Sequence, residues 1–278
     1  MSQSENSRGS NASVLATGNL QLKVCRHGPM FYNVHDMYVG RSLDQYGEYS
    51  ENEYNLLRQI IHPGETILDV GANIGAFTVP LGQAVGPSGR VLAFEPQRLV
   101  FQMLCANVMI NNLTNVEAIP AAAGDTGGSV NMPVPDYGSE GNFGGISISS
   151  RAENREWTRM VAIDSFELSA CHLIKVDVEG FEKNVLDGAV ETIKKFRPAI
   201  YLENDRKDKS PDLIKTLMEM DYRLYWHLPA LFNPDNFFGN SENLFRDIIS
   251  VNMICLPADR NQSMTGFDEI KTPDDWFV

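Results

Sequence analysis

The sequence predicts an α/β protein with a doubly wound, seven-stranded and mostly parallel sheet. Short apolar runs alternate with segments whose apolar residues recur at helical spacing, which is typical of consecutive β-α-β units. Several of these runs end in an acidic residue, so polar groups gather where α/β proteins bind their ligands. The expected strands lie within residues 67–70, 90–95, 116–123, 172–178, 198–203, 222–228 and 250–256.

The N-terminal part of the chain precedes this alternation. Residues 1–18 are rich in Ser, Asn and Gly and contain little to bury, so we expect a disordered tail. Weak alternation in residues 20–39, with a turn signal at Gly28-Pro29, predicts two short strands that form an N-terminal flap. Ser50-Glu51-Asn52-Glu53 has the pattern of a capping box at the start of a helix. We expect residues 19–278 to form one domain.

Helix signals follow most of the expected strands. Apolar residues recur at helical spacing up to Val85, in 99–109 and in 181–193, and Ser210-Pro211 supplies an N-cap and a proline at the first helical position. Residues 129–150 are instead rich in Gly, Ser, Asn and Pro, with strand-like runs near Val130 and Ile146. We interpret them as an insertion near the substrate side of the sheet.

A glycine-rich turn follows the first strand of the sheet, in Asp69-Val70-Gly71-Ala72-Asn73-Ile74-Gly75. Gly71 and Gly75 let the backbone approach a ligand where a Cβ atom would clash, and a helix N-terminus follows. The dinucleotide pattern G-x-G-x-x-G is incomplete, because Asn73 replaces its second glycine. The carboxylate of Asp69 would repel a pyrophosphate and attract a cation. A cationic cofactor with an amino-acid tail therefore fits better than NAD.

This turn resembles motif I of class I S-adenosylmethionine-dependent methyltransferases. Together with Phe94-Glu95-Pro96 and Ile174-Lys175-Val176-Asp177-Val178-Glu179-Gly180-Phe181-Glu182, it resembles the FkbM family of methyltransferases over about residues 40–205. The resemblance implies a Rossmann-like class I methyltransferase fold, methyl transfer as the activity and S-adenosyl-L-methionine as the cofactor. It does not define the methyl acceptor.

The expected cofactor-binding residues lie in the turn and at strand ends. Glu95 follows the turn by about 20 residues, where a carboxylate can accept both ribose hydroxyls, and the resemblance implies the same role. Gln97 could contact the adenosine. Asp69 and Asn73 could organise the turn and the amino-acid end of the cofactor, although Asp69 could equally be a purely structural acceptor for backbone N–H groups. Glu48 could contact the cofactor's ammonium or be an exposed loop acid. The full set is Glu48, Asp69, Gly71, Asn73, Gly75, Glu95 and Gln97.

Four strand-end residues are candidates for catalysis: Asp177, Glu179, Glu203 and His227. Methyl transfer from a sulfonium is a displacement, so the protein aligns the nucleophile and, for a hydroxyl, accepts its proton. Asp177 and Glu179 could be that base or could hold a divalent cation, and Asp177 could instead cap a helix. We expect no tightly held metal, because no histidine joins these carboxylates in sequence. His227 is a candidate base, although a lone histidine is more often structural.

Aromatic and amide side chains follow the sixth expected strand. Rings can cover the apolar faces of sugars and amides can bond hydroxyls, although Phe237 could simply pack its loop. We expect O-methylation of a hydroxylated small molecule or glycan. The expected substrate contacts are Trp226, Asn233, Asn236 and Phe237.

Charge and cysteine content limit the partners. The net charge is −13, and without a Lys/Arg cluster we expect binding neither to nucleic acid nor to anionic membranes. The cysteines lie far apart in apolar stretches, which predicts buried free thiols and a cytoplasmic location. They are Cys25, Cys105, Cys171 and Cys255. The oligomeric state is not predicted.

Two other functions stay open. The first is a nucleotide-binding oxidoreductase on a Rossmann-like fold, which the incomplete G-x-G-x-x-G pattern disfavours. The second is a catalytically silent binding module. Intact Asp69, Gly71, Gly75 and Glu95 speak against it, because a silent relative need not keep them.

Overall fold

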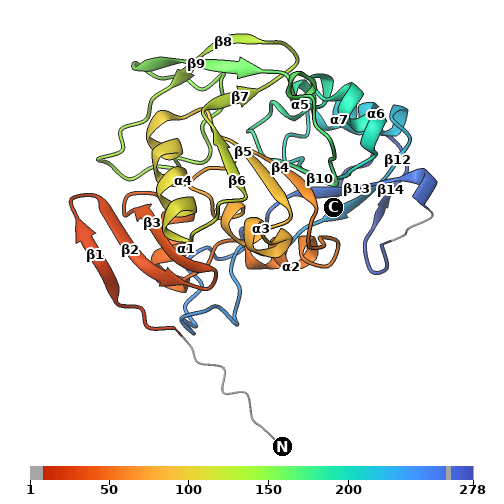
Figure 1. The fold of residues 1–278 in the computed structure, drawn as a ribbon. Helices are drawn as coiled ribbons and strands as arrows, with labels where there is room; N and C mark the ends of the chain where they lie inside the picture. The colour runs from red at the N-terminus through yellow and green to blue at the C-terminus, as the bar shows by residue number, and fades with distance from the viewer. Residues whose placement is uncertain (1–8, 261–263, 278) are drawn as a thin grey trace, which may run out of the picture.

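The computed structural model describes residues 9–260 and 264–277, and a central eight-stranded sheet runs through it (Figure 1). The strand order is β14-β12-β13-β11-β10-β4-β5-β6. Neighbours from β11 to β6 are parallel, whereas β13 is antiparallel to β11 and β12, and β14 is antiparallel to β12. The strands are β4 (Thr66–Val70), β5 (Arg90–Phe94), β6 (Val116–Ile119), β10 (Leu173–Val176), β11 (Ala199–Glu203), β12 (Tyr222–His227), β13 (Asn252–Pro257) and β14 (Glu269–Ile270). The predicted mostly parallel α/β sheet is therefore confirmed, with the two-residue β14 added at its edge.

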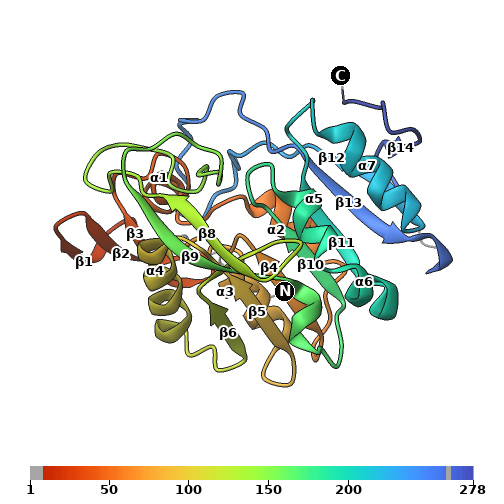
Figure 2. The same cartoon turned by 90° about the horizontal axis from the view of Figure 1, so that it is seen from above.

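Helices cover both faces of this sheet. Leu68 and Val70 of β4 pack with the helices of one face, while Ile67, which points the other way, packs with those of the opposite face. Burial on both faces explains why the strands are nearly continuous apolar runs. Figure 2 shows α4 on one side of the molecule and α5, α6 and α7 on the other. One face carries α2 (Glu51–Leu57), α3 (Thr78–Val85) and α4 (Arg98–Ile110), and the other carries α5 (Glu182–Asp187), α6 (Val190–Phe196) and α7 (Ser210–Glu219).

The N-terminal flap has three strands instead of the predicted two. They are β1 (Ser13–Thr17), β2 (Leu20–Cys25) and β3 (Gly28–Asn33), paired in that order and followed by α1 (Val39–Tyr46). Gly28 pairs with Cys25, so the hairpin turns at residues 26–27 and not at Gly28-Pro29. The predicted tail is wrong for Ser13–Thr17, which is exposed but paired with β2. Residues 1–8 of that tail lie outside the described residues.

Two predicted elements are divided. The run 116–123 forms β6 and then, after Pro120, the separate strand β7 (Ala121–Ala123), because proline has no N–H to continue a ladder. Strand β7 joins a second sheet, ordered β7-β9-β8, with β8 (Gly128–Pro133) and β9 (Arg155–Val161). The insertion thus has a strand at Val130, whereas residues 134–154, including Ile146, form a loop. The helix expected over 181–193 is interrupted at Gly188, where a Cβ atom would lie 1.9 Å from the carbonyl oxygen of Gly124.

The predicted capping box at the start of α2 is also wrong. Ser50 has a left-handed backbone with φ of 50°, and its hydroxyl donates to the carboxylate of Glu53. The two side chains of the predicted box therefore bind each other, whereas in a capping box each would bind a backbone N–H group. Burial raises the pKa of Glu53 above its ordinary value.

The cysteine prediction is mostly confirmed. The described part of the chain has four free thiols, of which those of Cys25, Cys171 and Cys255 are buried and that of Cys105 is half-buried. Burial raises the pKa of Cys25 and of Cys171 to about 12. Among the described residues, no helix combines the length and the apolar character needed to cross a bilayer.

Asn107 on α4 joins the flap to the glycine-rich turn. Its side chain is fully buried, and its amide donates to the carbonyl oxygens of Phe31 in β3 (3.0 Å) and of Ile74 in the turn (2.8 Å). Its oxygen accepts the N–H of Phe31 at 2.7 Å, so the side chain pairs with β3 as a neighbouring strand would. Apolar packing of Met30 and Tyr32 of β3 against Ile74 completes this junction. The flap is therefore fixed directly to the predicted ligand loop.

Candidate active site

A cavity of about 310 Å³ opens at the carboxyl edge of the sheet, near the ends of β4, β5, β10 and β11. The strand order reverses between β4 and β10, which is the switch point where α/β sheets bind ligands. The side chains that line the cavity include six carboxyl groups and one ammonium group. The carboxyl groups belong to Glu53, Glu95, Asp177, Glu179, Glu203 and Asp205, and the ammonium group belongs to Lys175. A neighbouring cavity shares Gly71, Glu95, Asp177 and Glu179 and extends to residues 121–123.

Lys175 is a buried cation at the base of the cavity. The parallel register places it directly beside Asp69, and its Nζ lies 3.5 Å from Asp69 Oδ1 and 3.5 Å from Asp177 Oδ2. The ammonium also lies 4.9 Å from the ring centroid of Phe77. Burial by itself lowers the pKa of Lys175, but the carboxylates of Asp177, Asp69 and Glu53 outweigh it and raise the pKa above its ordinary value. Lys175 is therefore charged, and its position in an otherwise apolar strand is the signal that could have identified it.

The glycine-rich turn packs against the loop that follows β10. A Cβ atom at Gly71, which has φ of 80°, would lie 1.8 Å from the carbonyl oxygen of Asp177. The N–H groups of Gly71 and Ala72 both donate to the carbonyl oxygen of Phe94. Asn73 also has a positive φ, of 51°, and its side-chain oxygen accepts the N–H of Ile74 at 2.7 Å. Residues 71–73 line the cavity, whereas Gly75 of the same predicted ligand loop does not.

Asp69 lies beneath this turn and not in the cavity. Its side chain is fully buried, its Oδ2 accepts the hydroxyl of Thr78 at 2.6 Å, and its Oδ1 faces Lys175. This position agrees with a role of Asp69 in organising the turn, while its expected role toward the cofactor stays a prediction. As a structural acceptor, Asp69 accepts a side-chain hydroxyl where backbone N–H groups were expected.

Glu95, which follows β5, binds the glycine-rich turn through its carboxylate. Its buried carboxylate accepts the N–H of Asn73 at 3.0 Å and the N–H of Gln97 at 2.8 Å. Burial raises the pKa of Glu95 to about 7, against the effect of these two hydrogen bonds. The Gln97 side chain donates to the carbonyl oxygen of Phe143 at 2.9 Å and accepts the hydroxyl of Tyr137 at 3.0 Å. Gln97 thus holds the insertion loop beside the site, which confirms the expected position of the insertion.

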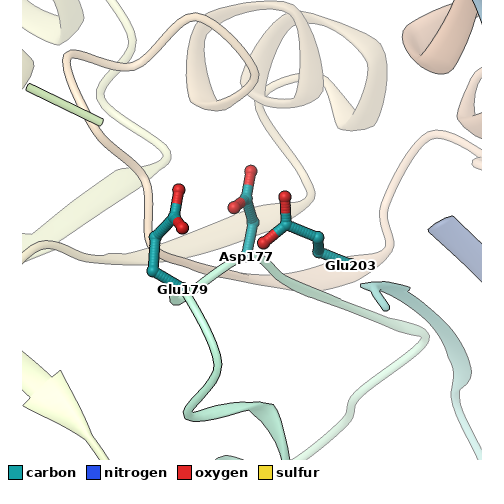
Figure 3. Close-up of side chains that lie close together, drawn as sticks. All are labelled: Asp177, Glu179 and Glu203. Atoms are coloured by element: carbon teal, nitrogen blue, oxygen red, sulfur yellow. The ribbon is translucent and has the colours of Figure 1, made fainter. Parts of the chain in front are cut away.

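Three carboxylates form a cluster within the cavity: Asp177, Glu179 and Glu203 (Figure 3). Asp177 and Glu179 follow β10, Glu203 ends β11, and one oxygen of each lies within 4.8 Å of the others. Glu179 is paired with Arg206, whose Nη2 lies 2.6 Å from Glu179 Oε2. The N-cap position of α5 is Phe181, so the alternative role of Asp177 as a helix cap is wrong.

The cluster has an excess of negative charge. Burial, followed by repulsion from Asp177 and Glu179, raises the pKa of Glu203 well above its ordinary value. Burial and Asp177 likewise raise the pKa of Glu179 to about 7, although Arg206 opposes the change. Buried Oε2 of Glu203 has no hydrogen-bond partner among the described residues. Such a group can retain a proton, or it can supply the oxygen ligands that Mg²⁺ or Ca²⁺ prefers.

Glu48 is not among the residues that line the cavity, so its predicted contact with the cofactor has no support here and stays a prediction. Its carboxylate accepts hydrogen bonds from Arg26 Nε (2.6 Å), Asn233 Nδ2 (2.7 Å) and the N–H of Phe237 (2.8 Å). Burial raises the pKa of Glu48, against the effect of Asn233 and Arg26. Glu48 therefore anchors the loop that follows β12.

The predicted substrate contacts in that loop likewise stay predictions, because their side chains have partners within the protein and do not line the cavity. The amide of Asn233 is bound to Glu48, and the amide of Asn236 donates to the carbonyl oxygens of Asn233 and Asn240. The ring of Phe237 lies 5.6 Å from that of Phe238 and 6.0 Å from the guanidinium of Arg26. These groups hold the loop on the protein, outside the cavity.

Trp226 and His227 also lie outside the cavity. Trp226 is buried against Trp276 and Phe277, with ring centroids 5.8 and 5.5 Å apart, and its predicted substrate contact stays a prediction. His227 Nδ1 lies 2.8 Å from the hydroxyl of Tyr201, and burial lowers the pKa of His227 to about 4. A half-buried imidazole that is bound to Tyr201 fits the structural alternative better than the role of a base.

A family model described as the methyltransferase FkbM domain matches residues 69–224, more than half of the chain. Among solved structures, the methyltransferase FkbM from Methylobacillus flagellatus is similar at 18% identity and a TM-score of 0.48, covering 79% of this chain and 55% of its own. A methyltransferase candidate from Streptococcus mutans in complex with SAH has 12% identity and a TM-score of 0.46 over 74% of this chain and 96% of its own.

Trm5b from Pyrococcus abyssi has 12% identity and a TM-score of 0.47 over 87% of this chain and 56% of its own. This chain thus spans little more than half the length of the Methylobacillus and Pyrococcus proteins. No curated protein matches it significantly.

Replacing Lys175 with Met should lower the free energy of unfolding by roughly 3–5 kcal/mol, because it leaves the carboxylate of Asp69 buried beside an apolar group. Urea unfolding at pH 7 measures the change. Lys215→Met is the matched control: the Nζ of Lys215 lies 3.9 Å from Glu219 in an exposed pair, so its loss should change stability by less than about 1 kcal/mol. Wild-type stability in Lys175→Met would contradict the organising role of this lysine.

Proposed function

Because the chain belongs to the FkbM family of methyltransferases, we propose that it transfers a methyl group from S-adenosyl-L-methionine to a hydroxyl group of an organic acceptor. One observation carries the proposal. The glycine-rich turn, the Glu95 carboxylate and the carboxylate cluster all line one cavity at the switch point of the sheet. The family favours methyl transfer over the oxidoreductase and silent-module alternatives.

The residues of the turn fit the proposed cofactor. Gly71 lies so close to the Asp177 carbonyl that no Cβ atom fits, and residues 71–73 of this tightly packed turn line the cavity. Each oxygen of Glu95 accepts one backbone N–H and keeps a second lone pair for a ribose hydroxyl. The excess of carboxylates in the cavity matches a ligand that carries a sulfonium and an ammonium group.

When bound, the cofactor supplies an electrophilic methyl group. The chain's part is to hold the acceptor hydroxyl beside the cluster and to accept its proton, which moves from the hydroxyl oxygen to a carboxylate oxygen. We assign this role to Asp177, whose side chain is 41% exposed, compared with 18% for Glu179. Lys175 fixes the Asp177 carboxylate from below, and Arg206 fixes Glu179. Glu203 would then complete the pocket around the hydroxyl.

We also propose that residues 19–278 act as one methyltransferase domain. Apolar packing supports this, because Met30 and Tyr32 of the flap share a core cluster with Ile74 and Val79 of the turn and α3. The C-terminal rings of Trp276 and Phe277 pack against Trp226 of the central sheet.

The affinity for S-adenosylhomocysteine should depend on pH through Glu95. Below about pH 7 the carboxyl group is protonated and loses acceptor capacity, so the Kd should fall as the pH rises from 6 to 8. Glu95→Gln should remove most of this dependence and weaken binding at pH 8 by roughly 1–3 kcal/mol. Titration calorimetry measures both effects.

Glu179, whose pKa is also about 7, lines the same cavity, and three further titratable groups interact with Glu95 itself. Asp69 raises its pKa, Lys175 lowers it, and Tyr137 stays neutral because burial raises its own pKa. None of these groups changes in Glu95→Gln, so the variant isolates the carboxyl group. A wild-type Kd that is constant from pH 6 to 8, or a Gln variant that binds as tightly at pH 8, would exclude Glu95 as the ribose acceptor.

Asp177→Asn should lower kcat by roughly 10²–10⁴-fold, the usual contribution of a positioned base. The Kd for S-adenosylhomocysteine should change little, because the substitution leaves the turn and Glu95 intact. Turnover is measured with any hydroxylated acceptor that the wild-type protein methylates. Asp187→Asn, at an exposed position paired with Lys183, is the control and should behave as wild type.

Chelation separates the two roles that the cluster can play. A proton-accepting Asp177 predicts that turnover survives EDTA. A divalent cation held by the three carboxylates would instead activate the hydroxyl by lowering its pKa. If turnover is lost in EDTA and restored by Mg²⁺, the cluster acts as a metal site and Asp177 is not the base. If Asp177→Asn and wild type have equal turnover, Asp177 is neither the base nor an essential metal ligand.

A further inference from the structure

Aliphatic side chains line the same cavity as the carboxylate cluster. Leu231, Ile248, Ile249 and Val251 come from the connection between β12 and β13 and reach the cavity together. Leu231 and Val251 are largely buried, whereas Ile248 and Ile249 are 40% and 42% exposed. Because both isoleucines belong to the lining, part of the apolar surface that they leave uncovered faces the space beside the carboxylates. We call these two residues the isoleucine wall.

The isoleucine wall is held in place by backbone pairing. The N–H of Leu231 donates to the carbonyl oxygen of Ile248 at 3.0 Å, and Ile249 forms an antiparallel bridge with Ala230. The N–H of Ser250 donates to the carbonyl oxygen of Pro229 at 2.9 Å. The wall is therefore presented by a paired segment, which lowers the entropy lost when a ligand packs on it.

Buried aromatic packing secures the same segment. Phe245 is buried and packs against Tyr38 and Tyr46, with ring centroids 6.1 and 5.8 Å apart. The hydroxyl of Tyr46 accepts the N–H of Leu244 and donates to the carbonyl oxygen of Glu242. An apolar surface that is fixed on both sides in this way can act as a binding surface.

Three amide side chains of this connection are used elsewhere. The amides of Asn233 and Asn236 bind Glu48 and the loop itself, and the amide of Asn240 donates to the carbonyl oxygen of Gln45. They are not available for the hydroxyls of a sugar. Toward the cavity, the connection contributes Ser250 together with the four aliphatic residues.

We propose that the acceptor is amphipathic, with a hydroxyl that reaches the Asp177–Glu179–Glu203 cluster and an aliphatic body that packs on Ile248 and Ile249. The inference rests on the proposed function, since it places the reacting hydroxyl at the proposed site of methyl transfer. The occupant is the acceptor, because the isoleucine wall and the cluster line one continuous cavity. Burial of aliphatic groups on the wall supplies affinity, and the cluster selects the hydroxyl.

The test uses 1-butanol and 1-octanol, which contain only a hydroxyl and an aliphatic chain. The full chain, with ¹³C-labelled isoleucine δ-methyl groups, is first saturated with S-adenosylhomocysteine and then titrated with each alcohol by NMR. The methyl signals of Ile248 and Ile249 should shift, and 1-octanol should bind at least about tenfold more tightly, because each buried methylene adds roughly fourfold. The conservative variants Ile248→Val and Ile249→Val assign the two signals.

A double substitution tests the wall directly. Ile248→Asn with Ile249→Asn should bring the two alcohols to within about threefold of each other, while the Kd for S-adenosylhomocysteine stays unchanged. Val24→Asn on the flap is the control, because Val24 is 50% exposed but lies outside the cavity lining. If the double variant does not fold, the comparison of the alcohols in wild type still decides the question.

The signal of Ile74, in the glycine-rich turn, reports cofactor binding separately. If S-adenosylhomocysteine shifts no methyl signal, the proposed function fails and the inference fails with it. If it binds but the two alcohols have equal affinity, or shift only isoleucines outside the cavity, the amphipathic acceptor alone is overturned. Shifts of Ile248 and Ile249 that follow protein concentration would mean that a second copy of the chain covers the wall, which also overturns the inference.

Discussion

The ammonium of Lys175 lies between Asp69 and Asp177, and the geometry of the site depends on this interaction. A buried charge is costly unless it is paired. Each of the two carboxylates must therefore stay close to the ammonium, at the observed 3.5 Å between Lys175 Nζ and the carboxylate oxygen. Asp69 is the last residue but one of the strand before the glycine-rich turn, and Asp177 follows the neighbouring parallel strand. One lysine thereby ties the proposed cofactor loop to the proposed site of methyl transfer. Apolar packing of the sheet supplies most of the stability, while this pairing holds the polar groups of the site in position.

The carboxyl edge of the sheet serves two proposed tasks, cofactor binding and methyl transfer. On one side, the turn and Glu95 present backbone and carboxylate acceptors in a space that only glycine permits at position 71. On the other side, the carboxylate cluster faces a cavity whose remaining wall includes exposed aliphatic groups from the β12–β13 connection. Hydrogen bonds of Asn107 tie the flap to the turn, and a buried hydrogen bond of Gln97 holds the insertion loop beside the cavity. The arrangement brings a polar reacting group and an apolar binding surface within one cavity.

Periodicity and strand-end chemistry predict most of the fold and part of the site. Parallel strands end at one edge, so Asp177, Glu179 and Glu203 could be expected together without knowledge of any contact. Loop side chains are different, because their direction depends on distant partners: Glu48 binds Asn233, which lies 185 residues away in sequence. The predicted roles of Glu48, Asn233, Asn236 and Phe237 could not take such partners into account. Trp226 and His227 lie in β12, but their partners Trp276 and Tyr201 also come from other parts of the chain.

A crystal structure of the protein with S-adenosylhomocysteine tests the central claim most directly. The account predicts that the homocysteine end lies along residues 71–75 and that both ribose hydroxyls lie about 2.6–3.2 Å from the Glu95 carboxylate. The sulfur should face Asp177, with the isoleucine wall still open to an acceptor. A ligand whose ribose lies away from Glu95, or whose sulfur faces away from the carboxylate cluster, would contradict both the assigned cofactor site and the methyl-transfer role of the cluster.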